Sequence, residues 1–277
     1  MRKNNMSSIK QFLKVWNSLL LLLLLPMGVS AETIEVRFAY IGPENHDAEL
    51  GAKQGLDEAN LQGQFLNQKY DLDIINQDKI NEHDFSKYIA VLTVLDTPSY
   101  LNLVDKLPGI PVFNLSNDDD DLRTACINNA FHIIPSAKMK SDAIAQWKQK
   151  HPESKAIAQA WHPDFVKFAA RDLNKRYKKS HETGMDDYSW AGWAAIKLTS
   201  DTIARTKMTK PSEILNYLKT QLVFDGQKGD DMSFRETGQL RQPLLLVEDN
   251  KIVAEAPVRG VAKPPTLDSL GTLHCAK

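Results

Sequence analysis

The sequence predicts an α/β protein whose parallel sheet carries helices on both faces. Three observations support this fold class. Residues 32–117 alternate β-rich runs with helical patterns, which is typical of repeated βα units. One of these runs, residues 88–95, is apolar on both faces, as expected for a central parallel strand. After Asp225 the pattern changes to short apolar runs joined by turns, which predicts antiparallel strands near the C-terminus.

Residues 1–31 have the composition of a secretory signal peptide. A basic leader precedes an unbroken leucine run at residues 19–25, and Val-Ser-Ala at residues 29–31 supplies a small-residue cleavage site. The apolar run is too short to span a bilayer comfortably, and no later stretch approaches a transmembrane length. We therefore expect a mature chain that starts at Glu32 and is exported to the periplasm. An uncleaved anchor is the alternative.

The mature chain is mildly acidic. The leader contains four of the 34 Lys and Arg residues and none of the 35 Asp and Glu residues, which leaves a formal charge of −5. This balance provides no electrostatic attraction for nucleic acid or for anionic membranes. We therefore expect neither as a partner.

The first half of the mature chain predicts four strands and two helices. The strands are runs of β-branched and aromatic residues at Ile34–Ile41, 70–75, 88–95 and 110–115. The first helix follows a Gly-Pro turn and has a face of small residues at helical spacing, namely Ala48, Ala52, Leu56 and Ala59. The second helix is predicted to begin at Thr97 as its cap, with Pro98 at its first position.

The second half predicts four more helices and several short strands. The helices are expected at residues 138–150 and 164–178, after a cap at Asp186 or Asp187, and from Pro211 onward. Strands are expected at residues 156–160, 232–235, 243–247 and 252–256, with Asp249 and Asn250 forming the turn between the last two.

The two cysteines predict a disulfide. In an exported chain two cysteines pair by default, and Cys126 has a single intramolecular partner available, Cys275 at the end of a Pro-rich tail. Closing so long a loop contributes at most about 5 kcal/mol on the chain-entropy model. We expect the bond to hold the tail against the body of the protein.

The sequence contains no strong catalytic motif. It lacks a Gly-x-Ser-x-Gly nucleophile elbow, a phosphate-binding glycine-rich loop and a Gly-x-Gly-x-x-Gly fingerprint after the first strand. The prediction is a protein without catalysis and without a cofactor.

Polar residues follow the third and fourth predicted strands, where ligands bind in open parallel sheets. These candidate ligand-binding residues are Thr97, Ser99, Asn114, Ser116 and Asn117. The alternative is ordinary capping and turn formation. Trp161 is a further candidate, because it stands beside His162 in a predicted loop and its ring could stack on a ligand. A buried tryptophan is the alternative there.

Four consecutive aspartates occupy residues 118–121. A turn could direct Asp118, Asp120 and Asp121 at a hard cation such as calcium. The alternative, which we favour, is a solvated loop whose aspartates cap the following turn. The prediction therefore includes no metal, and these three residues are weak candidates only.

The order of these features resembles the type I periplasmic binding proteins, specifically the branched-chain amino acid or amide class of ABC transporter solute receptors. The resembling pieces are FAYIGP, IPVFNLSNDDDDLR and MDDYSWAGWAAIKL. The chain is most similar to a subgroup encoded alongside pyrroloquinoline quinone-dependent alcohol dehydrogenases. That similarity rests on NDDDDLRTACINNAFHIIPS, AWHPDF, MSFRETGQLRQPLLL and LDSLGTLHC.

The sequence departs from this family in its second lobe. About ten residues, 151–160, stand where a second βα lobe is expected, and one crossover unit needs about 30. We therefore predict a signal peptide at 1–31 and a first lobe at 32–137. A reduced second-lobe region follows at 138–185, and return helices, antiparallel strands and the tied tail occupy 186–277, packed on the first lobe.

The resemblance implies a periplasmic solute-binding component of an ABC-type transport system. Its solute would be a small polar molecule, such as an amino acid, an amide or a related carboxylate, and its partner an ABC permease. The alternative is an accessory protein of a quinone-dependent alcohol oxidation system, with a periplasmic dehydrogenase or cytochrome as its partner.

Overall fold

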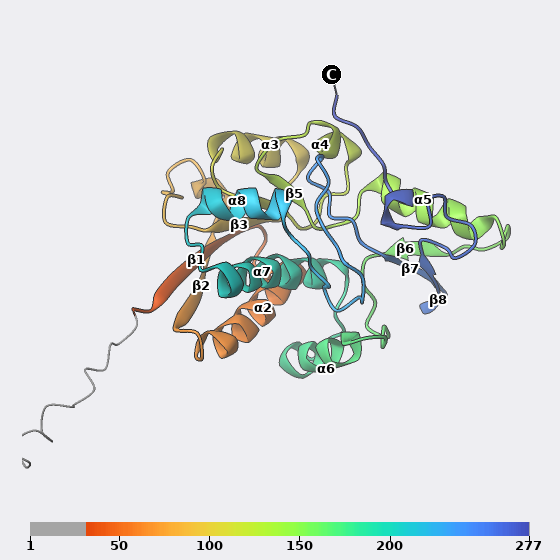
Figure 1. The fold of residues 1–277 in the computed structure, drawn as a ribbon, viewed down its shortest axis with the longest axis horizontal. Coiled ribbons are helices and arrows are strands. Elements are labelled where there is room, and N and C mark those ends of the chain that lie inside the picture. Colours follow the sequence, from red (N-terminus) through yellow and green to blue (C-terminus); the bar gives the residue numbers. More distant parts are fainter. Residues whose placement is uncertain (1–31, 277) are drawn as a thin grey trace, which may run out of the picture. The chain divides into compact units, whose positions relative to one another are not determined.

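The structure, a computed structural model, describes residues 32–276 (Figure 1). The predicted signal peptide lies outside the described residues. The described part contains two separate sheets, one of five strands and one of three. Within it, none of the helices combines the length and the apolar character that crossing a membrane requires.

The large sheet is parallel throughout, as predicted, with strand order β2-β1-β3-β4-β5. Its strands are β1 Ile34–Ile41, β2 Gln68–Ile75, β3 Ala90–Thr93, β4 Val112–Asn114 and β5 Ala130–His132. The third and fourth strands are shorter than their apolar runs. The fifth was not predicted, because three residues are too few to show a periodicity. Gln239 extends the sheet beyond β5 through a parallel bridge to His132.

Helices cover both faces of this sheet. Successive residues of β1 enter different cores, with Phe38 and Tyr40 on one face and Ala39 and Ile41 on the other. The Phe38 face packs against α2 Asp47–Gly63, α7 Asp187–Thr206 and α8 Pro211–Thr220. The opposite face packs against α3 Thr97–Lys106 and α4 Asp120–Thr124.

Helices α2 and α7 run side by side and are in closer contact than any side chain would allow (Figure 1). A Cβ atom built on Gly51 would lie 1.8 Å from the Ser189 carbonyl oxygen, and one on Gly192 would lie 1.9 Å from the Ala48 carbonyl oxygen. The predicted small-residue face of α2 therefore packs against α7 at Gly192.

The small sheet is antiparallel, with strand order β6-β7-β8. Its strands are β6 Ile157–Gln159, β7 Leu244–Glu248 and β8 Lys251–Ala256. Asp249 and Asn250 join the last two with φ angles of 48° and 57°, so both residues adopt the left-handed conformation of a tight hairpin turn. One face packs on α5 Ala137–Lys148 in a separate core (Figure 1).

The small sheet combines strands from distant parts of the chain. The hairpin of residues 244–256 pairs with β6, which precedes it by more than eighty positions. The amphipathic helix α6 Ala170–His181 follows β6, and two short 3₁₀ helices are η1 Gln77–Lys79 and η2 Leu267–Ser269. The boundaries predicted for the lobes remain a prediction.

Three local predictions were wrong. Asp96, and not Thr97, caps α3, because its carboxylate accepts the Ser99 N–H, so Pro98 is the second helical residue. Helix α6 begins at Ala170 and not at residue 164. Residues 232–235 form only isolated bridges, from Met232 to Phe224 and from Phe234 to Leu240, in place of a strand.

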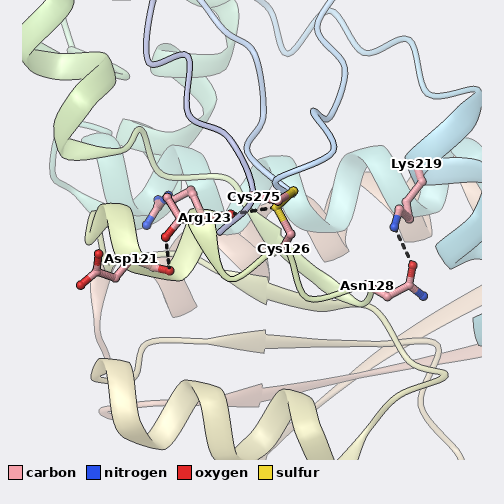
Figure 2. Close-up of a disulfide and its surroundings, with 7 residues drawn as sticks. Asp121, Arg123, Cys126, Asn128, Lys219 and Cys275 are labelled. Atoms are coloured by element: carbon pink, nitrogen blue, oxygen red, sulfur yellow. Dashed lines mark hydrogen bonds between the residues drawn. A yellow bond between two sulfur atoms is a disulfide. The ribbon is translucent and has the colours of Figure 1, made fainter. Parts of the chain in front are cut away.

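The disulfide joins Cys126, in the turn after α4, to Cys275 in the tail (Figure 2). The two residues are 149 positions apart in sequence, and their Cα atoms lie 5.5 Å apart. Beside the bond, the Ala276 N–H donates to the Thr124 carbonyl over 2.8 Å. The tail is therefore attached to the turn that follows the acidic run.

Replacing Gly51 with alanine is expected to destabilise the protein by about 1–3 kcal/mol, because the new Cβ forces α2 away from α7. Urea unfolding followed by circular dichroism measures the effect. Gly109→Ala is the matched control, since a Cβ atom there meets nothing within 4 Å. Equal unfolding midpoints for the two variants would contradict the close helix contact.

Candidate ligand site at the carboxyl edge of the large sheet

All five strands of the large sheet end at one edge, which we call the carboxyl edge. The segments of this edge described below are those at the ends of β1, β2, β3 and β4, at residues 42–46, 76–79, 94–99 and 114–119. Because β1 lies between β2 and β3, the chain changes direction across the sheet at this point, and ligands of open α/β sheets bind at such switch points. The loops after β1 and β3 touch, since a Cβ atom on Gly42 would lie 2.9 Å from the Cβ of Val94.

A cavity of about 660 Å³ opens where β1 and β2 end. Its lining carries charges of both signs, on Glu44, Asp78 and Lys79, together with the amides of Asn76 and Gln77. A second cavity of about 320 Å³ also includes Gln77 and is lined by Ser99 and Asn102. Of the predicted ligand residues, Ser99 therefore reaches a cavity.

His83 lines the first cavity and is fixed by a chain of hydrogen bonds. Tyr88 donates to Asp73 Oδ2 over 2.8 Å, so the Tyr88 oxygen accepts from His83 Nε2, also 2.8 Å away. In neutral His83 this places the proton on Nε2 and leaves Nδ1 as an acceptor. The bond from Tyr88 holds the pKa of Asp73 below its usual value. Sequence reasoning missed His83, because Asp73 lies on a separate strand.

Asn114 is buried at the end of β4, and protein groups satisfy its whole side chain. Its Nδ2 donates to the Asn117 carbonyl over 2.7 Å and to His132 Nδ1 over 3.1 Å. Its Oδ1 accepts the N–H groups of Ser116 and Asn117. Both donors and both acceptor positions are occupied, so Asn114 shapes the loop.

Thr97 and Asn117 connect the loops after β3 and β4. Asn117 Nδ2 donates to the Thr97 hydroxyl over 2.9 Å, and that hydroxyl donates to Asp119 Oδ2 over 3.0 Å. Ser116 lies beside them, half-buried, and its hydroxyl has no hydrogen-bond partner among residues 32–276. The structure thus brings Thr97, Asn114, Ser116 and Asn117 together.

Trp161 lies in the core and is not part of this group. Its ring is 1% exposed, stacks on Trp190 with centroids 5.9 Å apart, and donates from Nε1 to Asn174 over 2.8 Å. Its backbone N–H donates to Asp187 Oδ1 over 2.8 Å. Burial raises the pKa of Asp187, and these backbone hydrogen bonds oppose the shift.

Lys228 is a second buried charge that the sequence did not reveal. Its ammonium donates to Gln242 Oε1 over 2.7 Å and lies 3.8 Å from the ring centroid of Trp190. Burial lowers the pKa of Lys228 to about 7, although Asp187 and Asp230 act in the opposite direction.

Arg123 organises the loop from inside the protein. Its guanidinium is buried and donates to Gln239 Oε1 and to the carbonyls of Asn117, Asp119 and Ile134, at 2.8 to 3.0 Å. Burial lowers the pKa of Arg123 to about 10, against the nearby carboxylates. Figure 2 shows the residue one turn before Cys126. Its position two residues after the last aspartate was the available sequence signal.

The aspartates of residues 118–121 act mainly as local partners. Asp118 pairs with Lys140 over 2.9 Å, Asp119 caps α4, and Asp120 accepts the Lys138 N–H at the start of α5. Asp121 is exposed. Within residues 32–276 no group of three or more acidic, His or Cys side chains is arranged to hold a metal ion.

His132 lies under this loop and is fully buried. Because its Nδ1 accepts from Asn114, the neutral ring carries its proton on Nε2, which has no hydrogen-bond partner among the described residues. Burial lowers the pKa of His132 well below its usual value, and the charge of Arg123 lowers it further. The protein therefore satisfies one ring nitrogen of this core histidine and leaves the other without a partner within the described chain.

Comparisons with known proteins identify the fold. No family model and no curated protein matches the sequence. A branched chain amino acid ABC transporter periplasmic ligand-binding protein from Burkholderia xenovorans has a TM-score of 0.67 at 11% identity, covering 79% of this chain and 95% of that chain. A Desulfitobacterium hafniense ABC transporter substrate-binding protein in complex with Leu has a TM-score of 0.64 at 11% identity, covering 80% and 99%.

A third structure agrees. The branched-chain amino acid transporter substrate binding protein of Streptococcus pneumoniae, in complex with isoleucine, has a TM-score of 0.62 at 11% identity, covering 81% of this chain and 99% of that chain. The described chain therefore has the fold of type I periplasmic binding proteins, as the resemblance implied. At 11% sequence identity, this structural similarity establishes a shared fold.

Protonation of His132 is expected to make the protein acid-sensitive. Below about pH 6.5 the unfolded histidine binds a proton that the folded one does not, so stability falls with falling pH by up to about 1.4 kcal/mol per unit. Denaturant unfolding between pH 7.5 and 5 measures this slope, and His132→Phe should flatten it. The exposed His151→Phe is the control. A slope unchanged in His132→Phe would show that another group is responsible.

Proposed function

We propose that this protein is a solute-binding component of an ABC-type transport system, acting in the periplasm without catalysis. The observation that carries the proposal is the fold, which it shares over most of its length with proteins described as ligand-binding or substrate-binding. Two of those structures contain Leu or isoleucine. The carboxyl edge supports the proposal, because polar groups and cavities converge there.

The proposed solute is a small polar molecule such as an amino acid, an amide or a related carboxylate. The mixed charges of Glu44, Asp78 and Lys79 suit a molecule with charges of both signs. The hydroxyls of Ser99 and Ser116 and the amide of Asn117 are half-buried and can donate to a carboxylate. Thr97 holds Asn117 in position, because its hydroxyl accepts from the Asn117 amide and already donates to Asp119.

Asn114 and Trp161 take supporting roles in this proposal. The amide of Asn114 is fully used in holding the loop of residues 114–117. Trp161 packs beneath the start of α7 and does not reach the surface. Both residues would affect solute binding indirectly, by holding neighbouring residues in position.

The partner in this proposal is an ABC permease. An accessory role in a quinone-dependent alcohol oxidation system is the second hypothesis, and it rests on sequence motifs alone. Pull-down from a periplasmic extract separates the two. Stoichiometric recovery of a dehydrogenase or cytochrome would support the second hypothesis, and recovery of a permease would support the first.

Amino acids, amides and short carboxylates should raise the melting temperature of the mature protein in a thermal-shift screen. For a solute that does so, Ser116→Ala should weaken binding about tenfold in calorimetry, because one hydrogen bond to a charged group is lost. Ser180→Ala, on the exposed end of α6, is the control. The proposal fails if no solute binds at millimolar concentration.

A further inference from the structure

A cavity of about 450 Å³ lies between residues 235–241 and the tail, and it shares no lining residue with the two cavities at the carboxyl edge. Its walls come from MSFRETGQLRQ and LDSLGTLHC, two motifs that the proposed function does not use. Arg235 and Arg241 line it, together with Thr237, Thr272 and His274. Two arginines in one small cavity are typical of sites that bind oxyanions.

Arg235 is almost completely buried, with 8% of its side chain exposed. Its terminal nitrogens donate to the carbonyls of Leu267 over 3.0 Å and Gly271 over 3.3 Å. Its Nε is buried and has no hydrogen-bond partner among residues 32–276. A buried guanidinium N–H without an acceptor is costly, so this donor favours an additional ligand.

Arg241 faces the same cavity and is more accessible, with 33% of its side chain exposed. One terminal nitrogen donates to Ser233 Oγ over 2.7 Å. Its Nε lies 3.0 Å from Asp268 Oδ1, but the N–H is not directed at that oxygen and makes no hydrogen bond within the described chain. The Nε–H of Arg241 is therefore a second guanidinium donor without a hydrogen-bond acceptor in the described chain.

The two guanidinium groups share one carboxylate oxygen. Asp268 Oδ1 lies 3.3 Å from an Arg235 terminal nitrogen and 3.0 Å from Arg241 Nε, and its side chain is 59% exposed. Burial lowers the pKa of Arg235, and the charge of Arg241 adds to that effect. The exposed Glu236 lies at the rim. The cavity lining thus carries two arginines and two carboxylates, and of these carboxylates Asp268 is the one that lies within 3.3 Å of both guanidinium groups.

Tail attachment accounts for the two terminal nitrogens of Arg235, which donate to tail carbonyls, but not for the two Nε groups. The tail is already held by the disulfide, by the Ala276 N–H on the Thr124 carbonyl, and by the Gly271 N–H on Asp142 over 2.8 Å. These contacts need neither Nε group. Arg241 makes no hydrogen bond to a tail residue within the described chain.

We propose that this cavity is a binding site for a small oxyanion, a carboxylate or a phosphate, held between Arg235 and Arg241. Asp268 occupies the place of one anion oxygen in the unliganded protein and moves outward when the anion binds. The two Nε–H groups then gain acceptors. The site is independent of the proposed solute at the carboxyl edge.

Calorimetric titration of the mature, disulfide-bonded protein with inorganic phosphate, and separately with succinate, tests the proposal. Asp268→Asn should tighten binding of at least one anion about tenfold, since it removes the competing charge. Arg241→Gln should weaken binding at least tenfold. Arg259→Gln, at an exposed arginine on the hairpin side, is the control for net charge and should bind like the wild type.

The outcomes distinguish the possible sources of the anion. Binding of phosphate but not succinate assigns a phosphate-type ligand, and the reverse assigns a carboxylate. Equal weakening by Arg241→Gln and Arg259→Gln would indicate nonspecific charge attraction and overturn the proposal. Absence of binding of both anions to the wild type and to Asp268→Asn would also overturn it. Ser116→Ala should leave this binding unchanged, which separates it from the solute site.

Discussion

The buried guanidinium of Arg123 is the interaction on which the carboxyl edge depends. It meets four oxygens from three segments: the loop after β4, the end of β5, and Gln239, which is 116 positions away in sequence. Leaving a buried charge without its partner costs roughly 3–5 kcal/mol. These segments are therefore in place together in the folded protein, and the geometry of residues 114–119 depends on a contact made late in the sequence.

The acidic run follows from the same constraint. Four adjacent carboxylates repel one another in an isolated loop, but here Arg123 lies beneath them, Lys140 pairs with Asp118, and the first turn of α5 binds Asp120. The run thus lies beside the junction at residues 133–137, where the chain leaves β5 of the large sheet and enters α5. The disulfide begins three residues after Arg123, so the tail is fixed beside the same run.

The sequence was sufficient to predict features that depend on residues close together in the chain. The apolar run of β1 and the Asp-Asn turn were correct because their signals are local, and the disulfide followed from a count of two cysteines. The hydrogen-bond partners and the burial of the candidate site residues could not be predicted in this way. Asn114 had the right residue type and position, yet its amide is occupied by His132, whose strand of three residues gave no signal. Trp161 was a loop residue in sequence, but its stacking partner Trp190 lies on a later helix.

The junction between the two sheets also bears on how a solute would be held. Two-lobed receptors close around their ligand by changes in backbone angles at a hinge. Here the backbone that crosses between the sheets is bound on several sides: Ala137 donates to the Asp118 carbonyl, and the carbonyls of residues 133 and 134 accept from Gln242 and Gln239. A hinge at this place would have to break those buried bonds. Under the proposed function, a closing motion at this crossing would therefore have to offset the loss of those bonds with new contacts to the solute.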